Sequence, residues 1–533
     1  MKSRLLYWAI TCSLAGFIFG FDLMVISGVE QQIERLWDLS PNAHGWAISS
    51  AIWGTVIGSL LGGIPANKFG RKKTLMAIGL LYFVSAIGSA LATDVISFSV
   101  ARIIGGIGVG ISTVAAPIFI AEISPANRRG RLTGMFQFNI VFGLLIATVS
   151  NYLIKQFISV DSWRWMLGVE AIPALIYSAM CFSLPESPRW LISNGRREEA
   201  KKILGEINPE FDAAALEAGV AEIERANQAE SGTQTGRGLN FRKLRIPIML
   251  AFLVAFFNQL SGINAILGFA PRIFGMTGVS ESAELFNASL VTLVNLVFTL
   301  LGLRLIDKFG RRTLLYLGSF GYIASLGICA WAFSTYQAPF RVAAASLDVK
   351  AGSELVAKED LPENQRAREI SGLEQARLEL VESSSDPAFA GQSVDLPKDL
   401  TTEENIAVAK AALDDASRQA GSGSTIVLIC ILGFIAAHAI GQGTVIWVLI
   451  SEIFPNRARA FGQSLGSGTH WVFAALLTQL FPMAVARFSA STLFAFFAFM
   501  MFLHLLWVHF MVPETKGVAL EDMEARLGGN SEL

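Results

Sequence analysis

The sequence consists largely of apolar stretches about as long as a bilayer is thick, separated by short polar breaks. A transmembrane helix needs about 20 apolar residues, and this chain of 533 residues holds many such stretches. Only 16% of its residues are charged, whereas soluble domains carry roughly 25% charged residues. Backbone polar groups inside a bilayer must be bonded internally, which favours helices. We therefore predict an all-α polytopic membrane protein.

Uninterrupted apolar windows predict twelve spanning helices. They cover residues 7–29, 44–66, 73–92, 96–122, 132–154, 164–184, 246–275, 282–306, 313–335, 424–451, 460–485 and 490–512. The first window imitates a secretory signal, with Lys2 and Arg4 before an apolar run, but no small-residue cleavage site follows it. We expect this first span to be retained.

Basic residues are concentrated in alternate joints between the predicted spans. One set of joints holds basic runs at 71–73, 128–131 and 311–312, whereas the other set holds acids such as Glu30 and Glu34. Cytoplasmic loops of membrane proteins are rich in Lys and Arg. This bias predicts that both termini lie in the cytoplasm.

The two halves of the chain repeat the same short motifs. Residues 67–72 (NKFGRK) return as 307–312 (DKFGRR), and residues 121–125 (AEISP) return as 451–455 (SEIFP). Repeated halves are common in transporters, because a site at their interface can open to each side in turn. We predict one six-helix bundle at 1–185 and a second at 246–512.

Polar segments lie between and after the predicted bundles. Residues 186–245 are expected to form a cytoplasmic linker with short helices, and residues 513–533 a cytoplasmic tail. Residues 337–422 form an acidic insertion on the extracytoplasmic side, between the ninth and tenth predicted spans. We expect this insertion to be partly ordered, with surface helices in segments such as 363–382. A role in solute capture or partner docking is the alternative.

Seven motifs occur together along the chain. They are Gly70-Arg71-Lys72, Arg102-Ile103-Ile104-Gly105-Gly106, Ala121-Glu122-Ile123, Pro185-Glu186-Ser187-Pro188-Arg189, Gln259-Leu260-Ser261-Gly262-Ile263-Asn264, Ser451-Glu452-Ile453-Phe454-Pro455 and Pro513-Glu514-Thr515. In this order they resemble the sugar porter family of the major facilitator superfamily, over nearly the whole chain apart from 337–422. The resemblance implies twelve helices in two bundles, a helical linker, and monosaccharides or polyols as usual substrates.

An acid in the first predicted span suggests proton coupling. Asp22 follows Phe19-Gly20-Phe21, where an ionisable group is costly unless it is paired or faces a wet cavity. Arg102, early in the fourth predicted span, is its natural partner. In the resembled family, an acid at this position is characteristic of proton symporters. The alternatives are proton uptake when the pair separates and a fixed structural ion pair.

Sugar recognition needs hydrogen-bonding side chains that converge, together with an aromatic platform. The predicted substrate-binding residues are Phe19, Gln137, Asn258, Gln259, Asn264, Trp447, His470 and Trp471. The resemblance places Gln137, Gln259, Asn264, Trp447 and Trp471 at the family's sugar site, whereas Asn258, Gly268 and His470 depart from its usual residues. Interhelical hydrogen bonding and core packing are the alternative roles.

Charged residues at the predicted cytoplasmic helix ends form a second candidate group. They are Arg71, Glu122, Arg129, Glu186, Arg189, Asp307, Arg311, Glu452, Arg459 and Glu514. Pairs across the two halves could close the inner gate in one state and separate in another. Asn67 departs from the family's acid at that position, which Asp307 retains. Simple orientation signals are the alternative.

These patterns favour a transporter over other classes of membrane protein. The five histidines form no metal-ligand pattern and no nucleophile–base group appears, so we predict neither an enzyme nor a metal site. The net charge of −1 suggests no nucleic-acid partner. We predict a monomeric monosaccharide–proton symporter of a bacterial inner membrane, with the proton as coupling ion and no cofactor. A facilitative sugar or polyol uniporter is the main alternative, and a non-transporting sugar receptor a remote one.

Overall fold

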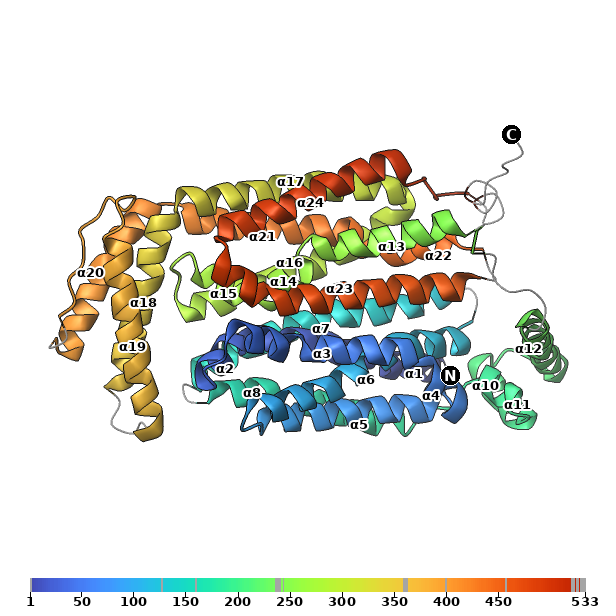
Figure 1. The fold of residues 1–533 in the computed structure, drawn as a ribbon. Helices are drawn as coiled ribbons and strands as arrows, with labels where there is room; N and C mark the ends of the chain where they lie inside the picture. Colours follow the sequence, from blue (N-terminus) through green and yellow to red (C-terminus); the bar gives the residue numbers. More distant parts are fainter. Residues whose placement is uncertain are drawn as a thin grey trace.

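The computed structural model describes residues 2–125, 128–158, 161–234, 241–242, 244–357, 363–397, 400–455, 458–518, 523 and 527. Every regular element within these residues is a helix, and the long helices run roughly side by side in two groups (Figure 1). The arrangement agrees with the predicted all-α fold. The described residues hold ten helices long and apolar enough to span a membrane, or eleven if the bent pair α3–α4 is counted.

The N-terminal half holds the first group of helices. Its elements are α1 (Lys2–Val25), η1 (Ile26–Gly28), α2 (Glu30–Leu36), α3 (Pro41–Leu61), α4 (Gly63–Phe69), α5 (Arg71–Ala90), α6 (Val95–Ile123), α7 (Arg129–Phe157), α8 (Ser162–Gly168) and α9 (Ala171–Cys181). The sixth predicted span is divided into α8 and α9, which explains why neither piece is long enough to span alone. Glu170 lies at this break and is buried.

The C-terminal half repeats the pattern, with interruptions in different spans. Its elements are α13 (Arg245–Leu260), α14 (Ile263–Gly268), α15 (Ala270–Gly275), α16 (Glu281–Phe309), α17 (Arg311–Thr335), α21 (Gly423–Ile440), α22 (Gln442–Ile453), α23 (Arg459–Arg487) and α24 (Ala490–Met511). The seventh and tenth predicted spans are therefore broken helices. Gly262 has a φ of +85°, which a glycine adopts readily and which ends α13. Interrupted helices of this kind build the binding sites of many transporters.

The linker helices and the insertion lie at opposite ends of the molecule (Figure 1). The linker contains α10 (Pro188–Ser193), α11 (Arg197–Ile207) and α12 (Ala213–Gln234), and we call this end the linker end. The start of α1 and the end of α24 lie there as well. The opposite end, which carries the insertion, is called the insertion end.

The insertion is more ordered than expected. It forms α18 (Gln337–Val356), α19 (Glu363–Ser384) and α20 (Thr402–Ala420), and α18 packs against both of the others. Their small and branched side chains enclose a separate core, to which Val342, Val349 and Leu380 belong. The low overall hydropathy concealed this core, because alanines supply much of its contact surface. The predicted surface helix at 363–382 corresponds to α19.

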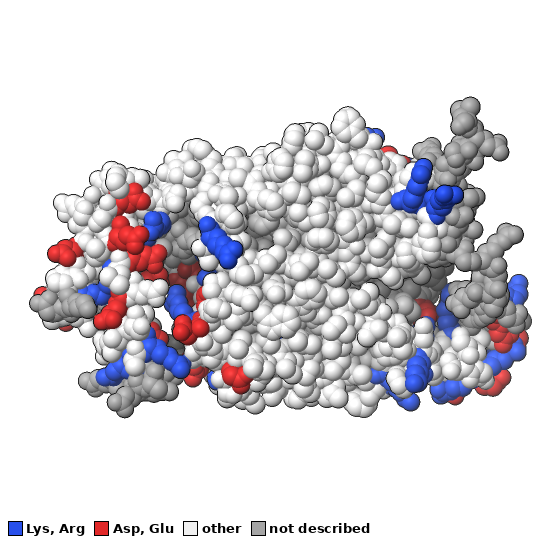
Figure 2. Space-filling view, viewed as in Figure 1, with Lys and Arg blue, Asp and Glu red and all other residues white. Residues whose placement is uncertain are grey.

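The visible surface separates into apolar and charged zones. On the face shown in Figure 2, charged side chains gather at the two ends, and the broad band between them is almost free of charge. Such a band suits the hydrocarbon core of a bilayer. The two halves meet inside this band, where α3 packs against α23 and α7 against α16.

Candidate functional site

The broken seventh span gathers three amide side chains. Asn258 and Gln259 end α13 and are buried, and Asn264 lies just after Gly262 on α14. Gln259 Nε2 donates to Asn258 Oδ1 at 2.9 Å, and Asn264 Nδ2 donates to Gln259 Oε1 at 2.7 Å. The break at Gly262 thus lets residues from two helical segments of one span approach one another.

An imidazole and three aromatic rings adjoin these amides. His470 on α23 lies 3.0 Å from Gln259 through its Nδ1. Its ring centroid is 5.2 Å from that of Trp447 and 4.9 Å from that of Trp471. Phe19 of the N-terminal half reaches Trp471 with a centroid separation of 5.8 Å. The structure therefore brings seven of the eight predicted substrate-binding residues into one connected group.

The eighth residue, Gln137, stands apart from this hydrogen-bonded group. It lies on α7 in the N-terminal half and is half-buried. Within the described part of the chain no hydrogen bond of its side chain is recorded. Its predicted role in sugar binding therefore stays a prediction.

The C-terminal half holds another group of hydrogen-bonded polar side chains, which was not predicted from the sequence. Tyr322 Oη lies 2.7 Å from His438 Nδ1 and donates to Gln442 Oε1 at 3.3 Å. The signal available in the sequence was weak: one histidine and one glutamine, four residues apart in an apolar stretch.

Asp22 and Arg102 form the predicted ion pair. Arg102 Nη1 donates to Asp22 Oδ1 at 2.5 Å, and Arg102 Nη2 donates to the Asp22 carbonyl at 2.8 Å. Both side chains are buried, and Glu170 adjoins them from the break between α8 and α9. Among the described residues the hydrogen bonds of the guanidinium go to Asp22, and Glu170 lies beside the pair as a second buried acid. Glu170 was not predicted as a site residue, although an acid inside an apolar span is a signal for one.

The charged residues at the linker end form two matching clusters, one in each half. Arg71 donates to both carboxylate oxygens of Glu122 at 2.9 Å, and its backbone N–H donates to Glu186 at 2.7 Å. Arg311 donates to Glu452 at 3.0 and 2.7 Å, and its backbone N–H donates to Glu514 at 3.0 Å. Both arginines therefore bind acids of their own half.

The other residues of the predicted gate group form weaker ion pairs, or none that the described residues show, in this conformation. Asp307 is exposed and lies 3.6 Å from Arg311. Arg189 is exposed, and the side chain of Arg129 lies outside the described residues. Arg459 has its Nε enclosed without a recorded acceptor among the described residues. Gating by pairs across the two halves at this end stays a prediction.

Ion pairs that do cross between the halves lie at the insertion end. Arg272 on α15 donates to Glu30 at 2.7 Å and also contacts Glu34, both on α2. Lys155 lies 2.8 Å from Glu281, and Gln31 donates to Glu284 at 3.0 Å. Burial would raise the pKa of Glu34, but its contacts with His44 and Arg272 outweigh burial and lower the pKa to about 2.

Hydrogen bonds between uncharged side chains also join the two halves. Trp53 Nε1 donates to Gln479 Oε1 at 2.9 Å, and the hydroxyls of Thr148 and Thr292 lie 2.7 Å apart. Each pair joins one half to the other. The insertion adds to them, because Arg368 donates to the carbonyl of Leu36 in the N-terminal half at 2.9 Å. The insertion end is closed in this conformation.

Comparison with known proteins gives a consistent result. The family model described as "Sugar (and other) transporter" matches residues 8–346 and 406–527. The D-xylose-proton symporter of Escherichia coli (strain K12) is 30% identical, with 97% of this chain and 94% of the relative aligned. The arabinose-proton symporter of Bacillus subtilis (strain 168) is 29% identical over 97% and 94% of the two chains. The inward open structure of the xylose transporter XylE from E. coli superimposes with a TM-score of 0.69 at 27% identity, covering 98% of this chain and 99% of that one.

Proposed function

The chain belongs to the sugar transporter family of the major facilitator superfamily, and from this premise we propose that it imports a monosaccharide by proton symport through alternating access. The observation that carries the proposal is the group formed by Asn258, Gln259, Asn264 and His470 against Trp447 and Trp471. The linker end faces the cytoplasm, and the insertion end faces the outside. The membrane is a bacterial inner membrane.

The amide and aromatic group suits a sugar for chemical reasons. Amide side chains offer both donors and acceptors, which match hydroxyl groups that also donate and accept. Trp447 and Trp471 supply apolar faces for the C–H surface of a sugar ring. In this conformation Asn258, Gln259, Asn264 and His470 bond to one another. A bound hydroxyl would replace such internal bonds.

Coupling to protons rests on Asp22, Arg102 and Glu170. A contact between two buried carboxyl groups is favourable only when one of them carries a proton. The Arg102 guanidinium can neutralise the other acid. A change in the distance from Asp22 to Arg102 would alter how strongly the pair holds a proton. All three residues belong to the N-terminal half, so coupling requires that α1 shift against α6 as the halves rock, which would link proton uptake to sugar movement.

Alternating access is supported by the closure at the insertion end. Arg272, Trp53 and Thr148 join the halves there, whereas the arginine clusters at the linker end stay within each half. One chain supplies both halves of the site, so a monomer suffices. The mechanism needs no enzymatic step and no cofactor, and the proton is the coupling ion.

The test is uptake of labelled monosaccharides and inositol into proteoliposomes, with and without an inward proton gradient. The wild type should accumulate one sugar only with the gradient. Asp22→Asn should lose accumulation but retain sugar exchange, because the sugar site is intact. Asp94→Asn is the matched control, since Asp94 is an exposed helix cap and Asn caps equally well.

Two other results would redirect the proposal. Equilibration that ignores the gradient would identify a uniporter, with Asp22 as a structural partner of Arg102. Failure to transport any monosaccharide or inositol would refute the substrate class.

A further inference from the structure

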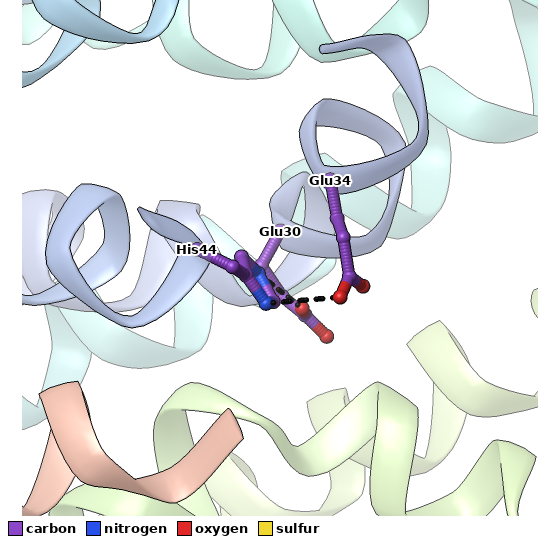
Figure 3. A group of neighbouring side chains, drawn as sticks. All are labelled: Glu30, Glu34 and His44. Carbon is purple, nitrogen blue, oxygen red and sulfur yellow. Dashed lines mark ion pairs between the residues drawn. The ribbon is translucent and has the colours of Figure 1, made fainter. Parts of the chain in front are cut away.

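Three side chains at the insertion end form a compact group within the N-terminal half. Glu30 and Glu34 lie one turn apart on α2, so that both carboxylates occupy the same side of that helix. His44 lies near the start of α3 and turns its ring toward them (Figure 3). Its Nε2 is 3.0 Å from Glu30 Oε2, and its Nδ1 is 3.4 Å from Glu34 Oε1.

His44 is fully buried but poorly satisfied by these neighbours. Both ring nitrogens are enclosed, and neither has a hydrogen bond of acceptable geometry. Its ring also packs edge-on against Phe269. An enclosed imidazole directed at two carboxylates without good hydrogen bonds is an arrangement that a metal ion could satisfy.

The donor atoms suit a specific class of ion. One ring nitrogen and one oxygen from each carboxylate lie within 4.8 Å of one another. Tetrahedral zinc holds its nitrogen and oxygen ligands at about 2.0–2.2 Å, which places them roughly 3.3 Å apart. Small side-chain rotations would bring the three donors to that spacing. The imidazole favours zinc and related transition metals over Mg²⁺ or Ca²⁺.

A cation from the other half occupies this position at present. Arg272 donates to Glu30 through both Nε and Nη2, and it contacts Glu34 with the same Nη2. The three candidate ligands belong to the N-terminal half, whereas Arg272 belongs to the C-terminal half. Opening of the insertion end would withdraw the guanidinium and leave two carboxylates and an imidazole together.

We propose that Glu30, Glu34 and His44 form a site for a divalent transition-metal ion of the zinc class, for which Arg272 competes. The site is accessible from the outside when the halves separate at the insertion end. A bound ion takes the place of Arg272 and hinders closure, so external zinc slows transport. This last consequence rests on the proposed function, whereas binding of the ion does not.

The decisive experiment measures Zn²⁺ binding to the purified full-length chain, without a histidine tag, by titration against a fluorescent zinc indicator. Removal of the competing guanidinium in Arg272→Gln should tighten binding of one Zn²⁺ by about tenfold or more, and His44→Asn in the same background should abolish that gain. Arg35→Gln is the matched control. It removes a positive charge from α2 itself, but Arg35 pairs with Asp348 instead of the three ligands.

Each outcome is informative. Equal tightening by Arg35→Gln would mean general electrostatics and overturn the site, as would unchanged binding in Arg272→Gln or insensitivity to His44→Asn. Arg272→Lys gives a second measure should Arg272→Gln fold poorly, because it keeps the charge but loses the two-pronged contact; intermediate tightening is expected, and wild-type binding would count against the site. These results do not depend on sugar transport, so failure of the sugar assay leaves them interpretable.

Discussion

At the insertion end, Arg272 of one half binds Glu30 and Glu34 of the other, whereas at the linker end Arg71 and Arg311 each bind a glutamate of their own half. The bonds are alike in length, at 2.7 Å for Arg272 to Glu30, 2.9 Å for Arg71 to Glu122 and 2.7 Å for Arg311 to Glu452. Their mechanical effect differs. A pair inside one rigid half braces it, and a pair between halves must break when that end opens.

Backbone packing shows the same difference between the ends. At the insertion end α3 approaches α23 so closely that a Cβ on Gly45 would lie 1.9 Å from the carbonyl oxygen of Gln479. At the linker end Gly70 and Gly310 contact glutamates of the same half, and a Cβ on them would lie 2.2 Å from Glu186 and 2.5 Å from Glu514. The comparison predicts which substitutions change conformation and which change only stability.

The largest effect on uptake is expected from Gly45→Trp. A side chain at this position meets backbone, which cannot move aside, and overpacking of this kind costs about 1–3 kcal/mol or more. The insertion end should fail to close, so that uptake falls at least about tenfold while sugar binding from the outside persists. Uptake and equilibrium binding are the measurements. Gly327→Trp is the control, because a Cβ there has no neighbour within 4 Å. Wild-type uptake by Gly45→Trp would refute the assigned closure.

A moderate loss of stability is expected from Gly70→Ala and Gly310→Ala. These glycines have φ values of +93° and +89°, and an added Cβ would lie 2.2 Å from Glu186 and 2.5 Å from Glu514. Each substitution should lower stability by about 1–3 kcal/mol, through strain and loss of the bonds from the glutamate to the helix start. Thermal unfolding is the measurement.

Gly195→Ala separates the two causes of that loss. Its φ is +74°, but a Cβ there has no neighbour within 4 Å. It should cost only about 1 kcal/mol, from strain alone. Equal losses at all three glycines would show that the glutamate contacts contribute nothing.

The smallest effect is expected from Asp348→Asn in the insertion. Asp348 lies 3.6 Å from Arg35 of the N-terminal half, and both side chains are more than half exposed. Exposed pairs contribute at most about 1 kcal/mol. Uptake should therefore change by less than about fivefold, and the difference should shrink at high salt. A larger change would mean that the insertion controls opening as strongly as Arg272 does.

The site was partly predictable because its motifs are local. Asn258, Gln259 and Asn264 lie within seven residues, and the glycine between them marks the break that turns them together. The pairing of Asp22 with Arg102 could be predicted, because burying either charge alone inside a membrane span is costly. Glu170 is recognisable as an acid inside an apolar span, but nothing in the nearby sequence indicates that the break between α8 and α9 places it beside Asp22.

Sequence alone determined where the apolar stretches, the repeated motifs, the polar linker and the family motifs lie, since each is a pattern of residues close together in the chain. Tertiary structure decided which charges meet. Arg272 and Glu30 are 242 residues apart, and Arg71 and Glu122 are 51 apart, yet both are Arg–Glu pairs near helix ends. Packing of the helices makes Arg272–Glu30 a contact between the two halves and Arg71–Glu122 a contact within one half. The reason is physical: an ion pair depends on distance in space, which hydropathy and spacing do not specify across separate helices.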